Sequence, residues 1–157
     1  MELHAFDVQL AVAHAHDLAL GRARSDAEHG RQARLTHDDA QRMAQEAQAE
    51  AAAHGWAVSI AVVDDGGHLL WLQRLDGAAP ISAHIAAAKA RSAALGRRET
   101  KGYEDMINQG RTAFLSAPEL QGMLEGGVPI LTGGHCVGAV GVSGVKSAED
   151  AQVARDG

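Results

Sequence analysis

The spacing of apolar residues along the chain predicts three helices. Residues 36–55 place an apolar side chain every three or four positions, with Thr36 as a good N-cap and Gly55 as a left-handed terminating residue. Residues 80–96 follow the same period between a proline and a glycine, and another short helix starts at Ser147. In the second of these helices one face gathers Ile81, Ile85, Ala88, Ser92 and Leu95.

Two segments alternate apolar and polar residues in the manner of β-hairpins. The first, residues 58–74, turns at DDGG, and the second, residues 128–143, turns at residues 132–134. Strands joined by such short turns are antiparallel, so the expected fold class is α+β, with helices packed on an antiparallel sheet. Residues 97–125 predict one or two short helices and an irregular loop.

Residues 1–34 differ from the rest and are expected to form an N-terminal extension, with the main domain at 35–157. Apolar residues near helical spacing predict a short helix, which a polar linker follows. His14 and Asp17 share one face of that helix, as a metal-binding pair or as solvated side chains. We expect the extension to dock on a neighbouring subunit.

Composition excludes several classes of function. Aromatic residues make up 3% of the 157 residues and the formal net charge is −6, which argues against binding to nucleic acid. There is one cysteine, hence no internal disulfide, and no apolar run long enough to cross a membrane. No secretion signal is evident, so we expect a cytoplasmic protein, unless a signal has been removed.

Glycine is concentrated in the stretch GGVPILTGGHCVGAVGVSG, residues 126–144. The turn explains two of these glycines, whereas Gly138, Gly141 and Gly144 follow it along a strand. A glycine inside a strand marks a bulge or a close approach of another group to the backbone. We therefore expect a ligand or a neighbouring subunit to approach this hairpin.

Several of these blocks occur together and in order in one known family. The segments LTHDDAQRM, VSIAVVDDGGHLLWLQRLDGA, IAAAKARSAA, GGVPI and CVGAVGVSG, followed by SAEDAQVA, resemble the GlcG/HbpS family, which includes the C-terminal domain of PduO-type proteins. The resemblance covers residues 35–157. It implies a profilin-like fold, a five-stranded antiparallel sheet with helices on both faces, and a homo-oligomer: a dimer, tetramer or octamer. It also implies haem as the candidate cofactor.

The helix at residues 80–96 carries most of the candidate binding groups. At about 100° per residue, His84 and Arg91 point the same way, Lys89 projects from another side, and Ser92 lies between them. His84 is the candidate ligand of haem iron, or else an interface or surface histidine. Lys89 is a partner for a propionate or other carboxylate, or else a surface lysine. The resemblance implies a hydroxyl at Ser92 near the ligand, where relatives more often have threonine.

The second hairpin supplies the other candidates. The GGVPI segment, with Gly127 and Val128, is expected to form one rim of the ligand pocket. His135 follows the turn and is either a binding residue or an exposed turn residue. Cys136 is either a thiolate ligand or a small buried apolar residue.

Three functions remain open at this point. The first is an oligomeric protein that binds haem or another tetrapyrrole for storage, sensing or degradation. The second is an enzyme of small-molecule catabolism that binds a carboxylated substrate in the same pocket, although GxSxG, HExxH, P-loop and GxGxxG motifs are absent. The third is an accessory subunit that acts by assembly.

Overall fold

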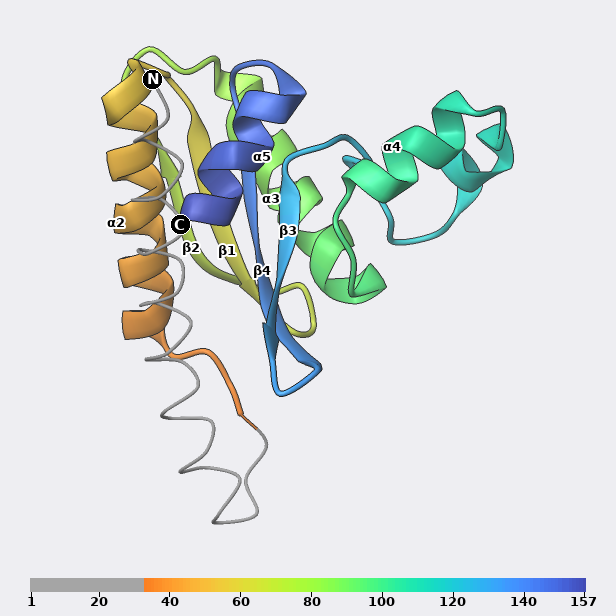
Figure 1. The fold of residues 1–157 in the computed structure, drawn as a ribbon, viewed down its shortest axis with the longest axis horizontal. Coiled ribbons are helices and arrows are strands. Elements are labelled where there is room, and N and C mark those ends of the chain that lie inside the picture. Colours follow the sequence, from red (N-terminus) through yellow and green to blue (C-terminus); the bar gives the residue numbers. More distant parts are fainter. Residues whose placement is uncertain (1–32) are drawn as a thin grey trace, which may run out of the picture.

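The computed structural model describes residues 33–157 as a sheet with helices on both faces (Figure 1). Four antiparallel strands lie in the order β2-β1-β4-β3, so the two hairpins meet through their inner strands β1 and β4. The strands are β1 (Ser59–Asp64), β2 (Leu69–Arg74), β3 (Gly127–Thr132) and β4 (His135–Ser143). The α+β class predicted from the pattern is therefore confirmed.

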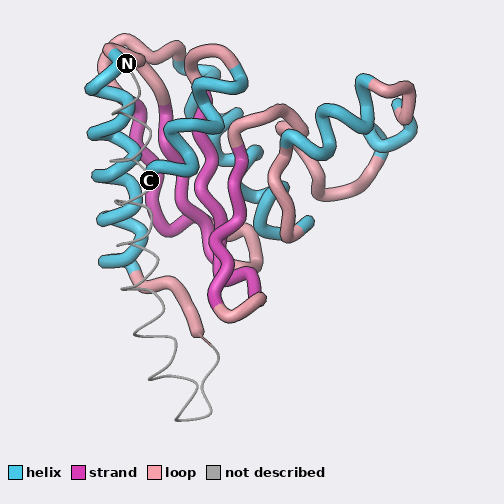
Figure 2. The backbone as a smooth tube through the Cα atoms, viewed as in Figure 1, coloured by secondary structure: helices cyan, strands magenta, loops and turns pink. Residues whose placement is uncertain are grey.

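Helices α2 (His37–His54) and α5 (Ser147–Asp156) cover one face of the sheet, and α3 (Pro80–Gly96) covers the other (Figures 1 and 2). As predicted, α2 begins at Thr36: this side chain and that of Asp39 form a reciprocal capping box. The helix ends at Gly55, whose φ of 68° is the left-handed conformation that glycine adopts without steric cost.

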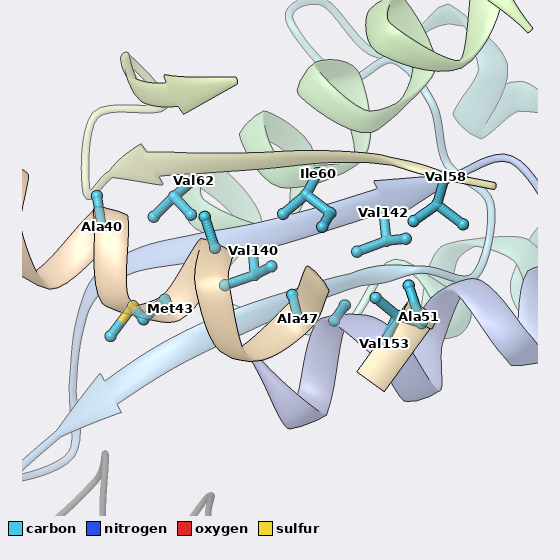
Figure 3. Packing of buried hydrophobic residues seen from close by; sticks show 12 residues of the cluster. Ala40, Met43, Ala47, Ala51, Val58, Ile60, Val62, Val140, Val142 and Val153 are labelled. Atoms are coloured by element: carbon cyan, nitrogen blue, oxygen red, sulfur yellow. The ribbon is translucent and has the colours of Figure 1, made fainter. Parts of the chain in front are cut away.

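The larger core lies between the sheet and the α2–α5 layer (Figure 3). Valine and isoleucine side chains of β1 and β4 meet small side chains of the helices, so α2 approaches the sheet closely. The members labelled in the figure are Ala40, Met43, Ala47, Ala51, Val58, Ile60, Val62, Val140, Val142 and Val153.

The core beneath α3 consists almost entirely of alanine. Ala86 and Ala90 of the helix pack on Ala61, Val63 and Ala139 of the sheet. With such small side chains, little separates the helix backbone from the sheet.

Gly141 makes this close approach of α3 possible, and Gly138 and Gly144 admit other parts of the chain's backbone. A Cβ atom on Gly141 would lie 2.1 Å from the carbonyl oxygen of Ala86, and one on Gly138 would lie 2.3 Å from that of Val63. One on Gly144 would lie 2.5 Å from the carbonyl oxygen of Ala57. The expectation of a ligand or second subunit at these glycines is therefore wrong: the chain's own backbone fills the space.

The segment between α3 and β3, residues 97–126, projects from the body as an arm (Figure 1). It contains α4 (Lys101–Asn108) and the 3₁₀ helix η1 (Thr112–Ser116), close to the two short helices that the sequence predicts. A tilted contact between Tyr103 and Phe114, with ring centroids 5.5 Å apart, joins the two helices.

The expected fifth strand is absent from the part of the chain that the structure describes. Residues 69–74 form β2, which is already one of the four strands, and residues 97–125 form the arm. The predicted helix near the N-terminus and the pair His14 and Asp17 lie outside the described residues.

Candidate functional site

Helix α3 presents its larger apolar side chains to solvent. Ile81 is 62% exposed and Leu95 39% exposed, whereas the alanines of the opposite face are buried. His84 is exposed on the same outward side, and Arg91 is half-buried there. The helix therefore has two apolar faces, and the bulkier one does not contact the sheet.

Two exposed leucines of β2 lie on the sheet face that α3 covers. Leu72 pairs with Ala61 and Leu69 with Val63, and both β1 residues pack under α3. Because paired residues of antiparallel strands share a sheet face, Leu69 and Leu72 lie on the α3 side of the sheet. They are 51% and 45% exposed.

The β1–β2 turn connects the two groups. A Cβ atom on Gly67 would lie 3.0 Å from Cγ of Arg91 and 3.5 Å from Cγ of Leu95. We call the combined region the α3–β2 surface, formed by Leu69, Leu72, Ile81, His84, Arg91 and Leu95. It joins exposed apolar area to an imidazole and a guanidinium, which is a combination suited to an amphipathic ligand.

His84 and Arg91 are brought to one side of α3, as their spacing predicts. They are seven positions apart in sequence, which corresponds to about 10 Å along the helix axis. A single flat ligand of haem size can span that distance, with its centre at the imidazole and an acidic edge at the guanidinium.

Lys89 lies on the opposite, buried side of α3 and is 1% exposed. Its Nζ donates to Oδ2 of Asp150 and to the carbonyl oxygen of Val142, each at 2.9 Å. Asp150 also accepts from the N–H of Val145 at 3.1 Å. Burial raises the pKa of the Asp150 carboxyl, and the hydrogen bond and charge of Lys89 oppose that rise. The ammonium thus ties α3 to β4 and α5.

The glycines of GGVPI pack over this lysine. A Cβ atom on Gly126 would lie 2.7 Å from Nζ of Lys89, and one on Gly127 would lie 2.5 Å from its carbonyl oxygen. The N–H of Gly127 donates to Oγ1 of Thr100 at 2.8 Å. Gly127 is thus buried and Val128 half-buried, in contact with the protein's own core.

Ser92 is fully buried beneath the segment that returns from the arm to β3. Its hydroxyl donates to the carbonyl oxygen of Gln121 and accepts from the N–H of the same residue at 3.1 Å. Thr100 holds the same segment further on, through the carbonyl oxygen of Leu124. Both hydroxyls therefore bind backbone in this structure.

His135 and Cys136 lie at the other end of α3. His135 is exposed beside the β3–β4 turn, and Sγ of Cys136 lies 3.8 Å from the carbonyl oxygen of Ala94 and 3.2 Å from that of Gly138. Burial raises the pKa of the Cys136 thiol, which favours the protonated form. The structure thus separates His135 from His84 by most of the helix.

Sequence reasoning misses two residues that contact the candidates. The pattern places Asp150 only in the first turn of the last helix, and Glu119, whose carboxylate accepts from Arg91, only in a loop. Within residues 33–157, no three His, Cys, Asp or Glu side chains are grouped so as to hold a metal ion. No helix of that range is long and apolar enough to cross a bilayer.

Comparison with known proteins agrees with the sequence resemblance. Protein GlcG of Escherichia coli strain K12 is 65% identical over 96 residues, which is 61% of this chain and 71% of GlcG. A crystal structure of a double mutant of HbpS from Streptomyces reticuli has a TM-score of 0.72 and 34% identity, covering 78% of this chain and 84% of that one.

A more distant structure agrees in fold. The haem complex of PduOC has a TM-score of 0.69 and 22% identity, covering 78% of this chain and 91% of that one. The family described as haem degrading protein HbpS-like matches residues 35–157. This chain, with its four-stranded sheet and its α3–β2 surface, belongs to that HbpS-like family.

Proposed function

We propose that this protein binds haem or a similar tetrapyrrole on the α3–β2 surface, for storage, sensing or degradation. The observation that carries the proposal is the position of His84, an exposed imidazole on the bulkier apolar face of α3. A flat apolar macrocycle needs such a face, and its iron needs a nitrogen donor. Membership of the HbpS-like family favours haem over other amphipathic ligands.

Each group of the surface has a distinct part in the proposed binding. His84 would ligate the iron, Leu72 and Leu95 would contact the ring, and Arg91 would pair with a propionate. Bound haem supplies redox chemistry at its iron, while the protein sets access and axial ligation. Lys89 has no direct part, because Asp150 already neutralises its charge.

A second candidate is binding of a small carboxylated substrate in the same region, by a catabolic enzyme or its accessory protein. The contact between Arg91 and the Glu119 carboxylate favours it, because it shows a guanidinium already positioned for a carboxylate. Such a ligand needs the polar end of the α3–β2 surface and makes no use of Leu69 or Leu72.

We further propose that the protein forms a homo-oligomer through its arm. Leu115 is 64% exposed and Leu124 44% exposed, on a segment that extends away from the sheet. Burial of these side chains against a second copy would remove apolar area from water. The molar mass in solution, measured by light scattering for the parent chain and for Leu115→Ser, tests this point.

A hemin titration followed at the Soret band tests the main proposal. The parent chain is compared with His84→Ala, and His135→Ala serves as the matched control, since His135 is exposed but lies at the other end of α3. We expect saturable binding, with a Soret spectrum changed by His84→Ala and unchanged by His135→Ala. Non-saturating binding, identical in all three proteins, would refute haem binding at this surface.

A further inference from the structure

The segment that returns from the arm crosses α3 beside the proposed ligand surface. We call residues 119–125, the returning end of the arm, the strap. Gln121 is fixed to Ser92 through both its N–H and its carbonyl oxygen. Next to it, a Cβ atom on Gly122 would lie 2.9 Å from Cβ of Ala88 and 3.0 Å from the backbone nitrogen of Lys89. The strap therefore lies directly on α3.

The strap also places a carboxylate on Arg91. The guanidinium of Arg91 donates to Oε2 of Glu119, and the two side chains are 38% and 70% exposed. Glu119 adopts a φ of 66°, a left-handed conformation that is uncommon for a residue with a Cβ atom. The ion pair thus accompanies an unfavourable backbone conformation at the residue that supplies the carboxylate.

We infer that the strap acts as an internal ligand: Glu119 and Gln121 occupy an Arg91–Ser92 subsite that binds the carboxylate of the protein's external ligand. This inference rests on the proposed function, and it adds a competitor for the site. Glu119 engages Arg91 through Nη2 and reduces the net positive charge that an external carboxylate meets at this guanidinium. A haem propionate or a substrate carboxylate therefore competes with Glu119 for Arg91, and release of Gln121 would free the Ser92 hydroxyl.

The strengths of these contacts allow displacement. An exposed ion pair contributes little to stability and is screened by salt, so the closed strap is held weakly at its Glu119 end. At its other end, the buried hydroxyl of Thr100 holds the carbonyl oxygen of Leu124. The strap can thus open at its Glu119 end while it stays attached to α4 and β3.

Glu119→Gln tests the competing carboxylate alone, because it removes the negative charge of the side chain and keeps its size. Glu99→Gln is the matched control: it makes the same charge change in an exposed pair with Arg155, at 2.8 Å. The probes are hemin, hemin dimethyl ester, which has no free carboxylate, and succinate. Loss of one exposed ion pair predicts a gain of about two- to five-fold in affinity for carboxylate-bearing probes.

We expect Glu119→Gln to bind hemin more tightly than the parent, with the dimethyl ester unchanged, and Glu99→Gln to match the parent for both. Equal hemin affinity in Glu119→Gln and the parent would overturn the inference, even where haem binding itself is confirmed. If no variant binds hemin, haem binding fails and succinate decides the inference. An increase in succinate affinity confined to Glu119→Gln supports it, and no increase refutes it.

Discussion

Nζ of Lys89 lies 2.9 Å from Oδ2 of Asp150, and neither side chain is more than 3% exposed. This pair joins the middle of α3 to the first turn of α5 on the far side of the sheet. Its second contact, to the carbonyl oxygen of Val142, adds β4 to the same connection. One ammonium therefore holds together elements from both layers of the fold.

Removal of one partner should destabilise the fold strongly. Lys89→Met leaves the Asp150 carboxylate buried without its cation, and we expect a loss of about 3 kcal/mol in the free energy of unfolding. Urea denaturation measures it. The double variant Lys89→Met with Asp150→Leu should recover part of the loss, because no buried charge then remains. If Lys89→Met were as stable as the parent, this role of the pair would be contradicted.

The close contact between Gly141 and α3 makes a second prediction. In Gly141→Ala the new methyl group meets the carbonyl oxygen of Ala86 and the backbone nitrogen of Ala90, at 2.1 and 2.5 Å. Because backbone atoms cannot move aside as a side chain does, we expect the free energy of unfolding to fall by about 3 kcal/mol or more. The midpoint of thermal unfolding reports it.

Gly133→Ala is the control for this substitution. Gly133 also lies in the second hairpin, and a methyl group on it would have no neighbour within 4 Å, but its φ is 57°. Gly133→Ala should therefore lower the free energy of unfolding by only about 1 kcal/mol, which is the cost of holding an alanine in the left-handed backbone conformation. Equal losses at the two positions would show that backbone conformation, and not the approach of α3, determines the requirement for glycine.

The stability of the α2–α5 contact should depend on pH through Asp156. Burial, followed by the nearby charge of Glu50, raises the pKa of Asp156 to about 6. A carboxyl with a raised pKa in the folded state stabilises the fold while it is protonated. That contribution is complete below about pH 4, is lost as the pH rises to about 6, and stays absent above that value.

Asp156→Asn replaces the charged form with a neutral amide. We expect a gain on the order of 1 kcal/mol in the free energy of unfolding at about pH 7.5, where the parent carries an unfavourable charge, and no gain at about pH 4. Urea denaturation at the two pH values tests it. A gain of equal size at both values would mean that the effect does not come from titration of Asp156.

The hydrophobic pattern predicts the four strands, the three principal helices and the capping of α2 at Thr36, because those features depend on neighbours in sequence. It could not decide which face of α3 meets the sheet, since both faces are apolar. Gly141 determines which face packs on the sheet, because the space over it admits only small side chains such as Ala86 and Ala90 of α3. The outward position of Ile81 and Leu95 follows from that packing.

The candidate site is predicted less completely, for a related reason. The helical period places His84 and Arg91 together, but Lys89 and Asp150 are 61 residues apart and meet only when α5 packs against β4. The contact of Ser92 with Gln121 likewise depends on the path of the strap, which has no periodic pattern. Local sequence therefore indicates which residues carry chemistry, whereas tertiary packing decides which of them are accessible.

The position of Leu72 beside α3 gives a prediction that separates a large apolar ligand from a small carboxylate. Leu72 is 45% exposed, so Leu72→Ser should leave the free energy of unfolding nearly unchanged. If a tetrapyrrole covers the α3–β2 surface, loss of that contact removes about 1 kcal/mol, or about five-fold, of hemin affinity. Leu131→Ser makes the same chemical change at a leucine that is 43% exposed on β3, at the opposite edge of the sheet, and should bind hemin like the parent. A binding constant unaffected by Leu72→Ser would place the ring elsewhere and favour a small ligand held at Arg91.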